Sequence, residues 1–158
     1  MKRILDIIDS IVDVVSTLLI FGILITTLIQ VVWRYVFNAP FMWTEELARD
    51  LGIWMVLITI GLVLRERRHL GFDILPDSWQ PALRLVTNVA VIFFAVFLFR
   101  PSLRFMAVAF GRQSPAIRMP LWILYASLPV GLGLLALFAV EGVWKNIRAL
   151  IEERKNRS

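Results

Sequence analysis

The sequence contains no cysteine and a single histidine, His69. Without cysteine the chain has no disulfide bond, no thiol chemistry and no cysteine-ligated metal. One histidine cannot supply both axial ligands of a haem or form a histidine-rich metal site. Nucleophile triads, phosphate-binding glycine loops and clusters of metal ligands are also missing from the sequence. We therefore expect no enzymatic activity, no cofactor and no metal site in this chain.

The long apolar stretches lack charged residues near their centres. A proton-coupled pump or a small drug antiporter is expected to carry a carboxylate at that depth. The polar groups are instead scattered hydroxyl and amide side chains, several of which can bond to their own helix backbone. No internal repeat or long linker divides the chain, whereas transporter cores usually contain repeats. We expect one domain over residues 1–158 that does not itself conduct a solute.

Hydrophobic residues make up 59% of the sequence and the mean hydropathy is +0.76, which is too high for a soluble domain. Val14–Trp33 and Met119–Val140 carry no charge, and each is long enough to cross the hydrocarbon core as a helix. Leu51–Leu64 and Leu85–Phe99 reach that length if flanking charged side chains extend to the interface. The predicted fold class is an all-α integral membrane protein. Its four transmembrane helices are expected at about residues 11–33, 47–65, 82–100 and 119–141.

The first apolar stretch is expected to be a retained helix, because no small-residue cleavage site follows it. With both termini in the cytoplasm, eleven of the 17 Lys and Arg residues lie on the cytoplasmic side and six on the other. This bias favours cytoplasmic termini. The net charge of +5 then reflects topology and attraction to anionic phospholipid, and we expect no nucleic-acid partner.

The connection Arg34–Asp50 between the first two spans concentrates charged and aromatic residues at the membrane edge. Thr44 is a candidate N-cap, with Glu45 and Glu46 in the first helical turn, where the helix dipole favours acids. Arg49 is spaced for ion pairs with both glutamates. Three interpretations remain open: a capped interfacial helix with an aromatic belt, an ion-carrying carboxylate cluster, or a contact with another protein.

In the second connection, His69 and Asp73 are spaced i, i+4 and could pair if a helix continues through Gly71. For His69 an interfacial hydrogen-bonding role is favoured over a catalytic one. In the third connection, apolar residues at helical spacing between Leu103 and Phe110 predict a short amphipathic helix lying in the interface.

Proline and glycine mark the fourth span. Pro129 lies inside the predicted helix, ahead of Gly131 and Gly133. A kink or a close approach of a neighbouring helix is the expected result. A broken, substrate-binding helix is less favoured, because transporter cores pair two such helices.

Three motifs occur in order along the chain and carry a family resemblance. They are Gln30-Val-Val-Trp-Arg-Tyr-Val-Phe-Asn-Ala-Pro-Phe-Met-Trp-Thr-Glu-Glu-Leu-Ala-Arg49, then Arg65-Glu-Arg-Arg-His-Leu-Gly-Phe-Asp73, then Ser114-Pro-Ala116 followed by Pro120, Trp122, Tyr125, Pro129 and Gly131. In these motifs the chain resembles, over nearly its whole length, the small membrane subunit (DctQ-like) of tripartite ATP-independent periplasmic (TRAP) transporters.

The resemblance implies three kinds of subunit in a bacterial inner membrane system. A soluble periplasmic binding protein captures an organic acid, such as a C4-dicarboxylate or a sialic acid. A large membrane subunit carries the substrate and the coupling sodium ions. The small subunit is a multi-pass protein that packs against the large one and widens the fixed frame against which the elevator moves.

The resemblance also implies two sets of contact residues. The first set would contact the large subunit and comprises Arg34, Asn38, Trp43, Glu45, Glu46, Arg49, Asp50, His69, Asp73, Pro120 and Tyr125. The second set would dock the binding protein and comprises Arg104, Arg112 and Arg118. No substrate-binding or catalytic residue is expected in this chain.

Two alternatives to this function remain. The main one is a membrane anchor or assembly subunit of a complex without transport activity, such as a respiratory complex. A stand-alone four-helix channel or transporter is a weaker third possibility, because the spans lack both repeats and central charges.

Overall fold

The computed structural model describes residues 2–39, 41–66 and 80–156. In these residues the chain forms four α-helices and no β-strand: α1 (Lys2–Val36), α2 (Met42–Glu66), α3 (Gln80–Val108) and α4 (Leu121–Asn156). Each helix contains a segment long and apolar enough to cross a membrane. The predicted all-α fold with four spans is therefore confirmed.

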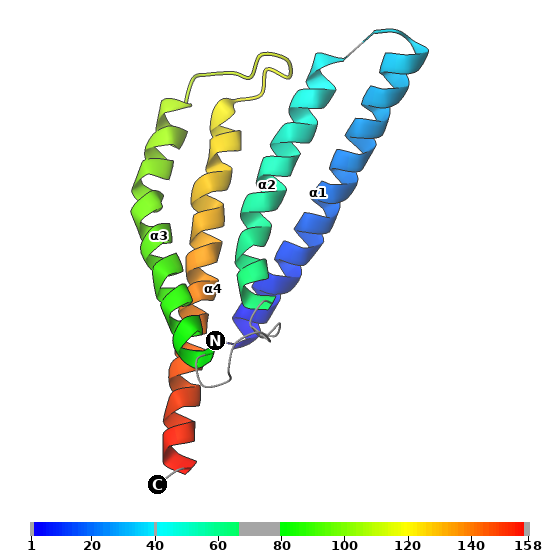
Figure 1. Cartoon of the computed structure of the whole chain (residues 1–158). Coiled ribbons are helices and arrows are strands. Elements are labelled where there is room, and N and C mark those ends of the chain that lie inside the picture. Colours follow the sequence, from blue (N-terminus) through cyan, green and yellow to red (C-terminus); the bar gives the residue numbers. More distant parts are fainter. Residues whose placement is uncertain (1, 40, 67–79, 157–158) are drawn as a thin grey trace.

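Each helix is longer than the span predicted for it, although α4 begins two residues later than predicted. The apolar spans run over Leu5–Val36, Met42–Arg65, Leu85–Val108 and Leu121–Arg148. Uncharged stretches mark only the part of a helix that lies in hydrocarbon, whereas helical hydrogen bonding continues into the interface on both sides. If all four helices cross, the start of α1 and the end of α4 lie on the same side of the membrane, and Figure 1 shows both towards the lower end of the molecule.

The prediction of a separate amphipathic helix between Leu103 and Phe110 is wrong. α3 continues without interruption through Pro101 to Val108, and its residues form the last turns of the span. Proline removes one backbone donor from the helix. The neighbouring Ser102 hydroxyl donates to the Phe99 carbonyl at 2.7 Å, which adds a hydrogen bond to the same turn.

The four helices lie side by side in the order α1, α2, α4, α3 (Figure 1). Within the described residues, α2 contacts α1 on one side and α4 on the other, and α3 contacts only α4. The chain therefore forms a layer one helix thick. Such a layer buries few side chains, and large apolar residues such as Leu18 and Phe93 remain 65% and 72% exposed.

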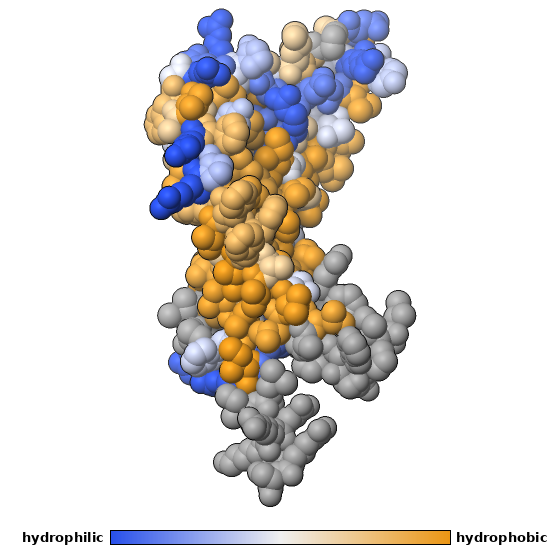
Figure 2. All heavy atoms as spheres, turned by 60° about the vertical axis from the view of Figure 1, so that its left-hand side comes forward, coloured by the Kyte–Doolittle hydropathy of each residue, from blue (hydrophilic) through white to orange (hydrophobic). Residues whose placement is uncertain are grey.

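The exposed apolar surface has the distribution expected of a membrane protein. Figure 2 shows an apolar band across the middle of the molecule, with hydrophilic residues towards its ends. In water a surface of this size would cause aggregation, whereas lipid or another membrane subunit can cover it.

Two hydroxyl groups join α1 to α2 beside their shared apolar cluster. The Thr59 hydroxyl donates to the Met55 carbonyl at 2.6 Å. Because this bond uses the only hydroxyl proton of Thr59, Ser16 is the donor in the 3.1 Å contact between the two side chains. Other hydroxyls bond to their own helix, as predicted: Thr27 donates to Ile23 and Ser127 to Leu124.

Two glycines mark a close approach between α2 and α4. A Cβ atom added to Gly131 would lie 2.5 Å from the Leu57 carbonyl oxygen. One added to Gly61 would lie 2.8 Å from the Phe138 ring and 3.2 Å from the Leu134 backbone. Small residues allow this proximity in membrane proteins. The predicted close approach is confirmed at Gly131.

Replacing Gly131 by alanine should lower the free energy of unfolding in detergent by about 2 kcal/mol or more, because the Leu57 backbone cannot move away locally. Gly133 provides a matched control on the same helix, since a Cβ atom there meets nothing within 4 Å. Gly133→Ala should leave the stability unchanged or slightly raised. Equal losses in the two variants would contradict the close approach.

Candidate functional site

The charged segment at the start of α2 contacts the connection between α3 and α4. The Glu46 side chain is only 6% exposed. Its Oε2 atom accepts hydrogen bonds from the backbone N–H groups of Ala116 at 2.9 Å and Ile117 at 3.1 Å. Hydrogen bonds to an ionised acceptor are stronger than those between neutral groups. Glu46 therefore joins two segments of the same chain, which is a role that the sequence did not predict.

Residues 112–121 form a hydrogen-bonded turn that presents these N–H groups. The Leu121 N–H donates to the Arg112 carbonyl at 3.0 Å, and the Ser114 N–H donates to the Met119 carbonyl at 2.9 Å. The Arg118 N–H returns to the Ser114 carbonyl at 3.2 Å, with Arg118 at a φ of 57°. This left-handed residue closes one helix-like turn. Successive N–H groups in such a turn form a concave site for an anion, which the Glu46 carboxylate fills.

Arg49 lies at the surface beside two buried carboxylates. Its guanidinium is 3.8 Å from Glu46 Oε1 and its Nε is 3.5 Å from Asp50 Oδ1, while its side chain remains 62% exposed. The predicted pairing of Glu46 with Arg49 is confirmed. Because an exposed ion pair contributes little energy, the Arg49 pairings hold the structure together less than the backbone hydrogen bonds of Glu46 do.

Thr44 is not the N-cap of α2, contrary to the sequence prediction. The helix begins at Met42, so Thr44 lies in its first turn. The Thr44 side chain is fully buried, and its hydroxyl donates to the Phe41 carbonyl at 2.8 Å. An N-cap oxygen would instead accept a hydrogen bond from the helix. The sequence pattern favours Thr44 because it does not show that the helix already begins at Met42.

Aromatic rings connect the end of α1 to the start of α2. The ring centroids of Trp33 and Phe37 are 4.5 Å apart, those of Trp33 and Phe41 4.7 Å, and those of Phe41 and Trp43 5.9 Å. Asn38 adopts a left-handed φ of 48° just after α1, a conformation that asparagine tolerates better than most residues. Phe37, Phe41 and Trp43, three aromatic residues of this connection, thus form a cluster with Trp33 at the end of α1.

A groove of about 560 Å³ lies between the start of α2 and the α3–α4 turn. Its lining combines apolar, acidic and basic side chains: Met42, Trp43, Glu45, Glu46, Arg49, Pro115 and Ala116. Four residues of the predicted contact set thus meet at one site. They are Trp43, Glu45, Glu46 and Arg49.

The remaining predicted contact residues are more dispersed. Arg34 and Asn38 are exposed at the end of α1, whereas Asp50 is buried within α2. Pro120 and Tyr125 lie at the start of α4. Arg112 and Arg118 are exposed on the same turn, and Arg104 is exposed on α3. His69 and Asp73 lie outside the described residues.

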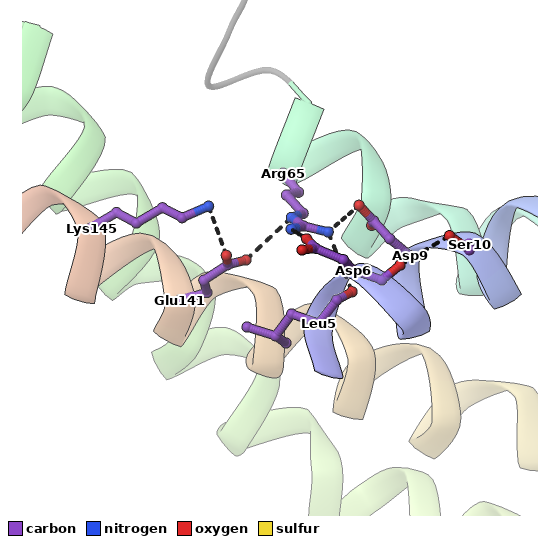
Figure 3. A network of polar contacts seen from close by, with 7 residues as sticks. All are labelled: Leu5, Asp6, Asp9, Ser10, Arg65, Glu141 and Lys145. Atoms are coloured by element: carbon purple, nitrogen blue, oxygen red, sulfur yellow. Dashed lines mark hydrogen bonds and ion pairs between the residues drawn. The ribbon is translucent and has the colours of Figure 1, made fainter. Parts of the chain in front are cut away.

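Sequence reasoning missed an ionic network at the opposite end of the layer, centred on Arg65 (Figure 3). Arg65 reaches α1 through ion pairs with Asp6 and Asp9, and it donates to the Leu5 carbonyl at 3.3 Å. Its Nε lies 3.3 Å from Glu141 on α4, and the Arg65 side chain is only 14% exposed. One arginine of α2 thus joins three helices.

The sequence indicates part of this Arg65 network. Arg65 directly follows the uncharged stretch Leu51–Leu64 and Glu141 directly follows Met119–Val140, so both are expected at the same edge of the membrane. Lys145, one turn after Glu141, lies 2.7 Å from its carboxylate. The sequence does not show the order of the helices in the layer, so it could not indicate that Arg65 meets Glu141.

Replacing Arg65 by glutamine should lower the free energy of unfolding by about 3 kcal/mol, because the buried Glu141 carboxylate loses one of its two cations. Arg148→Gln is the control, since this exposed arginine stacks on Trp144 and its loss should cost less than about 1 kcal/mol. Adding Glu141→Gln to Arg65→Gln should restore part of the lost stability. A double variant less stable than Arg65→Gln alone would contradict the pairing.

Comparison with known proteins identifies the family of the chain. The family model described as "Tripartite ATP-independent periplasmic transporters, DctQ component" matches residues 23–149. The chain is 23% identical to the C4-dicarboxylate TRAP transporter small permease protein DctQ of Vibrio cholerae, over 91% of this chain and 74% of that protein. It is 36% identical to the sialic acid TRAP transporter permease protein SiaT of Haemophilus influenzae, over 51% of this chain.

The chain spans only part of several relatives. The matched region is 13% of SiaT and 22% of the isethionate TRAP transporter permease protein DctMQ of Oleidesulfovibrio alaskensis, which is 28% identical over 82% of this chain. The region that matches a putative TRAP transporter small permease protein of Haemophilus influenzae is 54% of that protein. Since the family model matches most of the chain and part or all of each apolar span, this multi-pass membrane protein belongs to the DctQ family of TRAP transporter components.

Proposed function

We propose that the chain is the small scaffold subunit of a sodium-coupled, binding-protein-dependent importer of an organic acid. The observation that carries this proposal is the layer one helix thick, which leaves broad apolar surfaces for a larger membrane partner. Charged residues at both ends of the layer contact each other and the backbone of the same chain. This use of charge suits a rigid frame better than a path for ions.

The large TRAP membrane subunit is the proposed principal partner. SiaT and DctMQ are both named permease proteins, and each is several times longer than the region that this chain matches. Small and large subunits joined in one polypeptide would account for that length. In this proposal the small subunit stabilises the fixed frame of the large subunit's elevator. The family match disfavours the alternative of an anchor for a complex without transport activity.

Substrate and sodium binding are assigned to the other subunits. The relatives are named for four different compounds: sialic acid, C4-dicarboxylate, isethionate and ectoine. All four relatives are nevertheless similar in sequence to this chain. A subunit common to systems with such different substrates is unsuited to select among them. The excess of Lys and Arg near the termini supports cytoplasmic termini in a bacterial inner membrane, with phospholipid covering the apolar surface that remains free.

The groove at the start of α2 is the proposed centre of the contact with the large subunit. Trp43 and Arg49 are partly exposed there, and tryptophan and arginine are the residues that most often dominate interface energies. Arg34, Asn38, Glu45, Pro120 and Tyr125 would extend this contact. Glu46 and Asp50 are buried inside the chain and would support it indirectly.

Truncating Trp43 or Arg49 to alanine should reduce recovery of the large subunit in a pull-down from detergent-solubilised membranes. A hot-spot residue contributes about 2 kcal/mol or more to binding, so the affinity should fall by more than roughly tenfold. Reconstituted uptake should need this chain and should fall in parallel with recovery. Arg148→Ala, at the opposite end of the layer, is the control.

Unchanged complex yield for both variants would contradict the proposed contact. Full uptake by the large subunit and binding protein without this chain would contradict the scaffold role itself.

Arg104, Arg112 and Arg118 are the proposed docking residues for the binding protein. Reversing their charges to glutamate should raise the binding-protein concentration needed for half-maximal uptake. Because salt screens charges at exposed sites, the difference from the wild type should be largest at low ionic strength and shrink as salt is added. A difference that is equal at all salt concentrations would argue against electrostatic docking.

A further inference from the structure

The buried position of Glu46 assigns it a role beyond holding the fold. We propose that Glu46 is a positioning residue that fixes the α3–α4 turn in the shape that presents Arg112 and Arg118 to the periplasmic binding protein. This inference rests on the docking role proposed above. It adds a residue that the binding protein would never touch, since Glu46 is 6% exposed.

Both oxygens of the Glu46 carboxylate are engaged. Oε2 accepts the N–H groups of Ala116 and Ile117, and Oε1 faces the Arg49 guanidinium at 3.8 Å. The carboxylate thus lies between two backbone dipoles and a cation. This arrangement favours the ionised glutamate over a neutral side chain of the same shape.

The conformation of the turn depends on a contact from outside its own residues, the Glu46 carboxylate. Arg118 closes it in a left-handed conformation that is unfavourable for a residue with a Cβ atom. The two N–H groups held by Glu46 lie inside the segment that this residue closes. Without the carboxylate, those donors lose their acceptor and the strained conformation loses its support.

The same turn carries both exposed arginines. The Arg112 carbonyl accepts the Leu121 N–H, and the Arg118 N–H donates to the Ser114 carbonyl, so the backbones of both arginines belong to one hydrogen-bonded unit. A fixed backbone limits the directions in which their side chains point. Restricting a docking loop in this way strengthens binding because less freedom is lost when the partner arrives.

The absence of cysteine from the chain allows a direct test of the turn. Ser114 is 3% exposed, so a Ser114→Cys reporter should react slowly with a water-soluble maleimide. The rates are divided by the thiolate fraction, which the pH dependence of labelling gives, because loss of the neighbouring carboxylate also favours the thiolate. Glu46→Gln should raise this corrected rate by roughly tenfold, because the turn opens more often when its charged acceptor is lost. Glu45→Gln removes the charge of the adjacent exposed glutamate and should leave the rate unchanged. Equal rates in all three reporter proteins would overturn the inference.

The functional test uses the assembled transporter without the reporter cysteine. Glu46→Gln should raise the binding-protein concentration for half-maximal uptake severalfold, while uptake at saturating binding protein changes little. A loss of stability alone would instead lower the maximal uptake and the recovery of the complex. Glu46→Asp keeps the charge and should restore part of the affinity.

Reversal of Arg112 and Arg118 distinguishes the possible failures. If that reversal raises the half-maximal concentration and Glu46→Gln does not, the docking role stands and the positioning role of Glu46 is wrong. If neither change alters the half-maximal concentration, both the docking role and the inference built on it are wrong, whatever the labelling rates show.

Discussion

The contact between α2 and α4 is the interaction on which the rest of this structure depends. In the described residues it is the contact that joins the α1–α2 pair to the α3–α4 pair. Near the middle, Gly131 lets the two backbones approach closely. At one end Arg65 of α2 meets Glu141 of α4, and at the other Glu46 of α2 holds the turn that leads into α4. Removing this contact would leave two separate helical hairpins.

This single contact also explains the distribution of charge. A layer one helix thick has no interior large enough to hide a charge far from its surface, so buried charges need partners at the ends of the helices. Glu46, Arg65 and Glu141 all find such partners within the chain. The face of the layer in Figure 2 is apolar between these ends, and exposed large apolar residues on all four helices are available to a membrane partner. The proposed scaffold role follows from that division between charged ends and apolar faces.

The spans could be predicted because uncharged length alone decides whether a helix can cross the membrane. The separate helix predicted between Leu103 and Phe110 is wrong because the sequence does not show that a helix in lipid continues through Pro101 despite the missing donor. The pair of Glu46 and Arg49 was predictable from its spacing. The bond from Glu46 to Ala116 and the Arg65 network were not, because they join distant segments whose proximity depends on the order of the helices. The sequence shows that charged residues lie at the membrane edge, but it does not show which residues they contact.

If α2 and α4 hold the two hairpins together, their pairing should survive a break in the chain between them. The decisive measurement expresses residues 1–66 and 80–158 as separate chains with different tags. The two chains should insert, associate and purify together from detergent-solubilised membranes. If each chain inserts stably but is recovered alone, the contact between α2 and α4 does not hold the layer together.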